Sequence, residues 1–290
     1  MAEETPIFAK KPTKTKNKLV IVAIIIAVLA VIGGTIALIL ILVLNQPDYE
    51  KMSNALNEIK ESSQKLDLSG TDFAYLPNGR FTKTTHDRYI KNAKDDLKNF
   101  REHLDVIKNA ANELEQAGAA KSDVAKQYEK FKSKADDLLP KLESAAGDME
   151  KYIEFSDRYY NSKLVVLDSY SSDYSSLKEL TDGDIDKIFQ PLKEASSTTL
   201  REFAEGMSEY IKAVAKFYSK YADYLDGTKA ATDETRKEVE KDTAEIEKMT
   251  DEITELSDIS EDDIFDFTER DLTGFNEVTE KLADAVRELL

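Results

Sequence analysis

The chain of 290 residues contains no cysteine and no tryptophan, and it has only two histidines. Without cysteine there is no disulfide bond, no thiolate metal ligand and no thiol nucleophile, so the fold must depend on packing alone. His86 and His103 are seventeen residues apart, which is about 25 Å along one straight helix and too far for a shared metal ion. Each histidine is predicted to be a solvent-exposed helix residue.

The sequence also lacks the common catalytic motifs. No H-E-x-x-H, G-x-S-x-G or glycine-rich phosphate loop occurs. Asp182, Asp184 and Asp186 alternate as in a calcium loop, but Lys187 and Lys193 stand where an EF-hand needs glycine and glutamate. We therefore interpret these acids as the start of a helix. The sequence predicts no catalytic residue, no metal, no cofactor and no enzymatic activity.

Glycine and proline are scarce, with 10 and 6 residues, and a third of the chain is charged. This composition favours long helices over sheets. The charge is mainly acidic, because the five lysines and two glutamates of residues 1–18 leave 35 basic and 55 acidic residues in 46–290. A net charge of −20 there repels phosphates, so we expect no nucleic-acid partner.

One long apolar run is present, from Leu19 to Leu44, and nineteen of its 26 residues are Leu, Ile or Val. As a helix it would be about 39 Å long, against about 30 Å for the hydrocarbon core of a bilayer. A cleaved signal has a much shorter apolar region, and a buried soluble helix of this kind would need a larger core. The sequence predicts an uncleaved transmembrane signal-anchor helix over residues 19–45.

The flanking charges predict the orientation of this anchor. Five lysines precede the run, and lysine excess marks the cytoplasmic end of a membrane helix. Residues 1–18 should form a short, disordered cytoplasmic tail, and residues 46–290 should lie outside the membrane. Gly33 and Gly34 are candidates for contact with a second membrane helix, because small residues allow close approach. A homo-oligomer is therefore one of the expected assemblies.

After residue 45, apolar residues recur at three-four spacing in several segments bounded by turn residues. Together they predict an all-α fold: an elongated, antiparallel, coiled-coil-like bundle of about five to six helices. Pro140 should kink or split the third helix, and Ser122 should be its N-cap. The expected helices cover 47–66, 90–118, 122–152, 185–226, 232–256 and 260–289.

Two connecting segments carry aromatic residues that offer rigid, amphipathic contact area. These side chains either contact a partner or pack on the bundle, and the sequence leaves both readings open. Lys163 to Leu167 has strand propensity, but we expect a helix end followed by a loop because no second strand is present to pair with it. The candidate partner-binding residues are Phe73, Tyr75, Arg80, Phe81, Tyr170 and Tyr174.

These observations predict a membrane-anchored, non-catalytic scaffold or interaction protein of the cell envelope, in a bacterium that does not depend on disulfides. Its partners would be the lipid bilayer, through residues 19–45, and an unidentified protein or envelope component. The alternative is a sensory or accessory ectodomain that acts through a partner membrane protein, since one membrane helix and an 18-residue tail leave no output domain. A helical pore-former is disfavoured, because no second apolar helix follows.

Overall fold

The chain divides into two units, Met1–Asp48 and Tyr49–Leu290. The computed structural model describes residues 46–66, 83–166, 179–225, 227–257 and 268–290. These residues belong almost wholly to the second unit. No helix among them is long and apolar enough to cross a membrane. The anchor predicted over 19–45, with Gly33 and Gly34, lies outside the described residues and stays a prediction.

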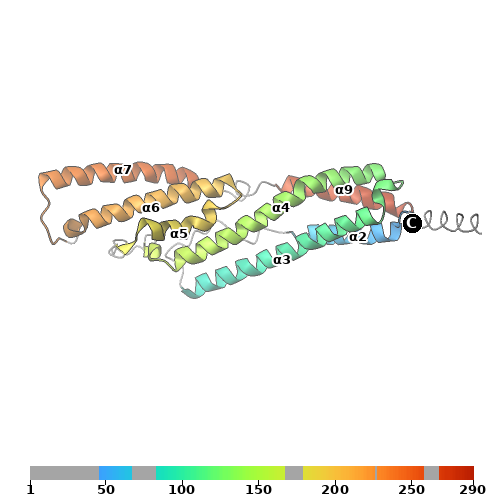
Figure 1. Cartoon of the computed structure of the whole chain (residues 1–290), viewed down its shortest axis with the longest axis horizontal. Helices are drawn as coiled ribbons and strands as arrows, with labels where there is room; N and C mark the ends of the chain where they lie inside the picture. Colours follow the sequence, from blue (N-terminus) through green and yellow to red (C-terminus); the bar gives the residue numbers. More distant parts are fainter. Residues whose placement is uncertain (1–45, 67–82, 167–178, 226, 258–267) are drawn as a thin grey trace, which may run out of the picture. The chain divides into compact units, whose positions relative to one another are not determined.

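The described residues form seven α-helices and two short 3-10 helices, and they include no β-strand (Figure 1). This confirms the predicted all-α helical bundle. The α-helices are α2 (Tyr49–Ser63), α3 (Lys83–Gln116), α4 (Ala125–Tyr160), α5 (Asp182–Lys193), α6 (Thr198–Leu225), α7 (Asp233–Ser257) and α9 (Glu269–Arg287). The 3-10 helices are Ala119–Lys121 and Lys163–Val166, so the described part of the segment with strand propensity is helical.

Four helices pack as a closed ring. Helix α2 contacts α3 and α9, and α4 contacts the same two helices. Their three-four apolar spacing puts one stripe of each helix inside the ring, where a large aliphatic or aromatic side chain stabilises the fold by about 1.5–3 kcal/mol. The rings of Phe131 and Phe275 join α4 to α9, with centroids 5.5 Å apart. Fully buried members include Met52, Leu56, Ile59, Ile107, Leu114, Leu138, Leu282 and Val286.

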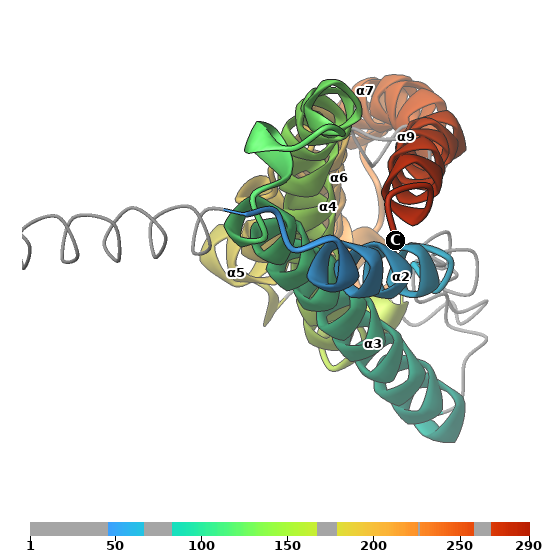
Figure 2. The same cartoon turned by 90° about the vertical axis from the view of Figure 1, so that its right-hand side faces the viewer.

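The ring brings the start of α2 close to the end of the chain. The chain ends just after α9, and its last residue lies beside α2, at the end where α2 begins (Figures 1 and 2). An ion pair of 3.2 Å between Lys60 and Glu280 also links α2 to α9. The first and last helices of the second unit are therefore neighbours in space.

A second group of helices forms an open row. Helix α5 contacts α4 and α6, and α6 contacts α7. Aromatic side chains make the first of these contacts, with Phe155 of α4 packed 5.0 Å from Phe189 of α5 between centroids. Within the described residues, α6 is the only element with which α7 makes extensive contact. No α7 side chain that the structure describes is fully buried.

The single helix predicted over 185–226 is wrong, because the chain breaks between α5 and α6. Asp148 of α4 is buried and accepts hydrogen bonds from the backbone N–H groups of Ser196 (2.6 Å) and Ser197 (2.8 Å). The guanidinium group of Arg201 donates to the carbonyl oxygens of Ala195 and Ser196. These side chains satisfy backbone groups that a helix terminus leaves unpaired, so the break is stabilised.

Other predicted boundaries differ less. Helix α3 ends just before Gly118, whose positive φ of 84° suits glycine. The prediction that Ser122 is the N-cap of α4 is wrong, because the helix begins three residues later. The Ser122 hydroxyl instead accepts a hydrogen bond from the Val124 N–H in the preceding turn. Helix α4 also runs unbroken through Pro140, so the predicted alternative of a split is wrong. The Pro140 side chain is exposed.

The later helices follow the predicted boundaries more closely. Helix α6 ends at Leu225, and Gly227 follows with a φ of 71°, as expected for a helix stop. Helix α7 matches the predicted 232–256 to within one residue at each end. The predicted start of the last helix at Ser260 lies outside the described residues. The described helix α9 has its N-cap at Thr268.

Candidate functional site

The residues predicted to bind a partner are not among those that the structure describes. They belong to two segments, 67–82 and 167–178, and they stay predictions. They are Phe73, Tyr75, Arg80 and Phe81 in the first segment, and Tyr170 and Tyr174 in the second. The candidate site within the described residues has to be sought on the packed helices.

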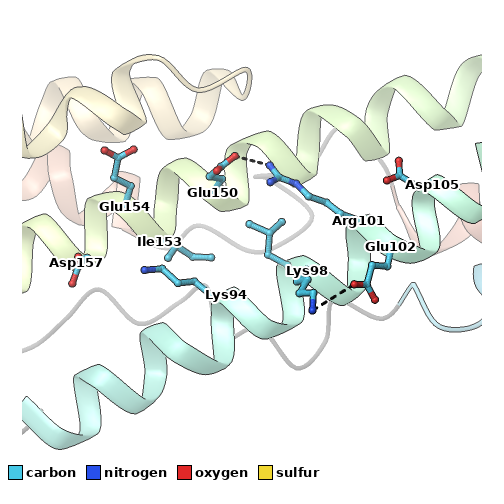
Figure 3. A pocket seen from close by; sticks show the side chains of 10 residues that line it. Lys94, Lys98, Arg101, Glu102, Asp105, Glu150, Ile153, Glu154 and Asp157 are labelled. Carbon is cyan, nitrogen blue, oxygen red and sulfur yellow. Dashed lines mark hydrogen bonds and ion pairs between the residues drawn. The ribbon is translucent and has the colours of Figure 1, made fainter.

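A groove lies between α3 and α4, with a volume of about 530 Å³ (Figure 3). This volume falls within the range of about 300–1,000 Å³ that is usual for small-molecule pockets. The groove is open to solvent along the two helices. Its lining consists of Lys94, Leu97, Lys98, Arg101, Glu102 and Asp105 from α3, with Glu150, Ile153, Glu154 and Asp157 from α4.

The wall from α3 carries a row of basic side chains. Lys94, Lys98 and Arg101 stand at positions i, i+4 and i+7, and this spacing places them on one face of the helix. Leu97, between them, is buried and contributes to the floor. Figure 3 shows the Lys94 side chain reaching toward Ile153 of the facing helix. The α3 wall therefore presents three cations, together with the acids Glu102 and Asp105, above an apolar floor.

The wall from α4 carries a matching row of acids. Glu150, Glu154 and Asp157 have the same i, i+4, i+7 spacing, and Ile153 contributes the apolar floor on this side. Glu154 forms an ion pair of 2.6 Å with Arg158, one turn further along α4. Since Glu102 and Asp105 also line the groove from α3, its basic groups come from α3 alone and its acidic groups come from both helices.

One ion pair bridges the groove. Arg101 donates to the Glu150 carboxylate at 2.6 Å, and Lys98 lies 3.6 Å from Glu102 on its own helix (Figure 3). These side chains are between 45% and 73% exposed, and such pairs typically stabilise a fold by no more than about 1 kcal/mol. Lys94 forms no ion pair with any described residue. A ligand that replaces these ion pairs therefore lowers the stability of the fold only slightly.

His86 is buried, in contrast to the predicted exposed residue. Its ring stacks on Tyr160 with centroids 3.9 Å apart and an angle of 8° between planes. Its Nε2 is 3.5 Å from Oδ1 of Asp157, a groove residue, and makes no hydrogen bond to a described residue. Burial lowers the pKa of His86, although Asp157 and Asp87 oppose the shift. His103 is half-exposed on α3.

The groove places charged side chains of both signs beside an apolar floor. Burial keeps the imidazole of His86 neutral near pH 7, and the other polar groups of the groove are charged side chains on its two walls. Among the described residues, no group of three acidic or histidine side chains is placed to hold a metal ion. Molecules with both a positive and a negative group suit the groove, because it is lined by cations of α3 and by carboxylates of both helices.

The sequence interpretation did not single out this groove. The repeated i, i+4, i+7 spacing of basic residues over 94–101 and of acidic residues over 150–157 is visible in the sequence. That signal could have identified the two charged rows. It could not show that α3 and α4 pack with these rows facing each other, because this depends on the order in which the helices pack.

No protein-family model matches the chain, and neither a curated protein nor a solved structure matches it. The proposals below therefore depend on the residues and the geometry.

Proposed function

We propose that this chain is a membrane-anchored, non-catalytic helical interaction protein, with residues 46–290 on the outer side of the membrane. The observation that carries this proposal is the uncharged run over 19–44, preceded by five lysines. Only four residues separate its end from Tyr49, the first residue of α2. Such a run is typical of a transmembrane helix, and the lysines mark its cytoplasmic side.

The character of the second unit supports an interaction role. Its helices other than α7 each bury an apolar stripe, and the charged residues of the unit are predominantly acidic. This surface disfavours anionic lipid and nucleic acid and suits contact with protein or with basic envelope components. The groove between α3 and α4 is a contact site for such a partner, because its two walls select a ligand by charge.

A sensory or accessory ectodomain is the second candidate. The observation that favours it is the volume of the same groove, about 530 Å³, which suits a small molecule. Such an ectodomain would pass its signal through a partner membrane protein. The two candidates share the membrane anchor and differ in what the groove binds.

Single-cysteine labelling on intact cells tests the topology, because the natural chain contains no cysteine. Glu240 is exposed on α7, and Thr15 lies in the predicted cytoplasmic tail. We expect a membrane-impermeant maleimide to label Glu240→Cys on intact cells, and to label Thr15→Cys only after the membrane is opened. The reverse pattern would show that the second unit faces the cytosol. Recovery of both labelled variants in the soluble fraction of lysed cells would show that residues 19–45 do not anchor the chain in the membrane.

Thermal unfolding with small molecules distinguishes the two functions. L-lysine and 6-aminohexanoate carry both charges, and hexylamine and hexanoate carry one each. If the groove is a sensor site, the first two at millimolar concentration raise the melting temperature and the last two do not, since only a ligand that binds the folded state stabilises it. Lys94→Ala should remove the effect. Equal responses to all four molecules would favour the interaction protein over the sensor.

A further inference from the structure

Helix α6 has an open side in the row α5–α6–α7. A hollow of about 440 Å³ lies over it, between the start of α5 at Asp182 and helix α7. Helix α6 contacts α5 and α7, but within the described residues no fourth helix closes these three into a ring, in contrast to α2–α3–α4–α9. The residues lining the hollow are Asp182, Glu209, Lys212, Ala213, Lys216, Phe217, Lys220, Asp242, Glu245, Ile246 and Met249.

The floor of this hollow is apolar and only partly covered. Ala213 and Phe217 of α6 and Ile246 and Met249 of α7 line it, and all four are half-buried. In the closed ring the corresponding seam residues, such as Leu282 of α9, are fully buried. A further helix laid over α6 would complete the burial of this strip, because four-helix bundles bury one stripe from each helix.

The charges beside the strip indicate which helix fits. Lys212, Lys216 and Lys220 form a row on α6, at positions i, i+4 and i+8. Lys212 pairs with Asp186, and Lys220 pairs with Asp242, each at 3.0 Å. Lys216 is exposed and makes no ion pair with any described residue. Asp182, Glu209, Asp242 and Glu245 also line the hollow, so Lys216 is the member of the row that is left to attract an acidic side chain of a further helix.

Helix α7 of the same chain has the required character. Acidic residues outnumber basic ones along it, and Glu238, Glu245 and Glu252 recur at seven-residue spacing on one flank. Glu245 borders the hollow, is exposed and makes no ion pair with any described residue. Helix α7 also has a free side, because its extensive contacts within the described residues are with α6 alone.

We propose that α7 of a second copy packs on the open side of α6, and that the two copies exchange this contact around a two-fold axis parallel to the helices. The α6–α7 hairpins of both copies then form an antiparallel four-helix bundle. Lys216 of each copy lies against Glu245 of the other, so the interface is self-complementary, as a two-fold interface must be. The second copy covers the strip around Phe217 and Ile246.

The size of this face is sufficient for a specific dimer. Helix α7 has 25 residues and is about 38 Å long. Two helices side by side, at the usual spacing of about 10 Å, present a face of about 750 Å². This is close to the ~800 Å² per partner of a standard stable interface. The proposal concerns residues of the second unit and does not depend on the proposed function.

A charge exchange between chains tests the proposal. Lys216→Glu alone and Glu245→Lys alone each create two like-charge contacts in the dimer, and an equal mixture of the two variants restores both opposite-charge contacts. By sedimentation equilibrium of the full chain in density-matched detergent, we expect each variant alone to dimerise roughly tenfold more weakly than the natural chain. The mixture should regain the natural affinity, and circular dichroism should show that both exposed-site variants fold.

Disulfide cross-linking gives a second readout in a chain without cysteine. A mixture of Lys216→Cys and Glu245→Cys chains should form a covalent dimer on mild oxidation. A mixture of Lys216→Cys and Glu247→Cys should not, because Glu247 is exposed and points away from the hollow by helix periodicity. A natural chain that stays monomeric at about 100 μM, or charge variants that dimerise as it does, would overturn the proposal and leave the open side of α6 to a different protein.

Discussion

Asp148 shows how one side chain decides the path of the chain. It lies on the buried stripe of α4, next to Met149 and Tyr152, and its carboxylate accepts two backbone hydrogen bonds from Ser196 and Ser197. The sequence does contain a signal, since an acid at a seam position needs a partner. It does not contain the identity of that partner, because residues 48 and 49 positions away meet Asp148 only after folding. The predicted continuous helix failed for this reason.

Replacing this carboxylate should therefore be costly. We expect Asp148→Ala to lower the free energy of unfolding by about 3 kcal/mol, because two charge-assisted hydrogen bonds are lost and two backbone N–H groups are left without a partner. Asp148→Asn, which keeps an acceptor oxygen, should cost less. Urea denaturation followed by circular dichroism measures both. Asp137→Ala, at an exposed position on the same helix, serves as the control and should change stability by less than about 0.5 kcal/mol.

His86 should make the stability depend on pH in a defined direction. Burial lowers its folded-state pKa below 6.5, so the unfolded chain takes up a proton first as the pH falls. The free energy of unfolding should therefore decrease below pH 6.5, until the folded-state pKa is reached. His86→Phe keeps the stacking on Tyr160 without a titrating group, and it should remove this part of the pH dependence.

Urea denaturation at several pH values between about 7.5 and 5 checks this prediction. Its control is His103→Gln, which retains His86 and should follow the natural chain. If the His86→Phe and natural chains lose stability in parallel over this range, His86 is not the group responsible.

At the scale of elements, the apolar spacing in the sequence was a reliable guide to the helices and a weaker guide to their ends. The seams of α3, α4 and α9 follow the three-four pattern, and the buried positions agree with it. Boundaries failed where a cap from elsewhere in the chain competes with local signals, as at Ser122 and at the break before α6. Which helices pair was not predictable, because amphipathic faces are similar and loops allow several orders.

Closure of the ring should make α9 sensitive to truncation of its buried side chains. Leu282 is fully buried between α9 and its neighbours, so Leu282→Ala should lower the free energy of unfolding by about 3 kcal/mol, through lost burial and a residual cavity. Leu289→Ala, where the side chain is 41% exposed, provides the matched control and should be nearly neutral. If urea denaturation shows the same loss of unfolding free energy for Leu282→Ala and Leu289→Ala, α9 does not close the ring.

Helix α7 lies at the end of the open row and should open locally more easily than the helices of the closed ring. Its described side chains are exposed or half-buried, and its extensive contacts are with one helix. In a dilute, monomeric sample we expect the amides of residues 237–250 to exchange with solvent faster than those of α2 and α9, because local opening exposes little apolar surface. Hydrogen exchange followed by mass spectrometry measures this. Slower exchange at higher protein concentration would in addition agree with the proposed dimer.

For the whole molecule, the division after Asp48 separates a segment with an uncharged run from a unit with its own core. Every member of the buried apolar cluster lies between Met52 and Val286. The sequence placed its own boundary at residue 45, from the end of the apolar run. The charge balance of each part could also be read from the sequence, whereas the closed ring and the open row required the packed structure.

A fragment of residues 46–290 should fold without the preceding segment. We expect its melting temperature to lie within about 2 °C of that of the full chain in detergent, since no member of the buried cluster is removed. Circular dichroism melts of both proteins make the comparison. A fragment that unfolds without a cooperative transition would show that residues 1–45 contribute to the fold.

The neighbouring positions of α2 and the chain end have one more consequence. The order in which the helices are joined is separable from the way they pack, because a short linker from Leu290 to Tyr49 would close the unit into a circle. The circle could be reopened in the exposed connection 227–232, between α6 and α7, where few contacts would be lost. Such a circular permutant would begin with α7 and end with α6, so these two helices of the open row would become terminal while the closed ring stayed covalently continuous.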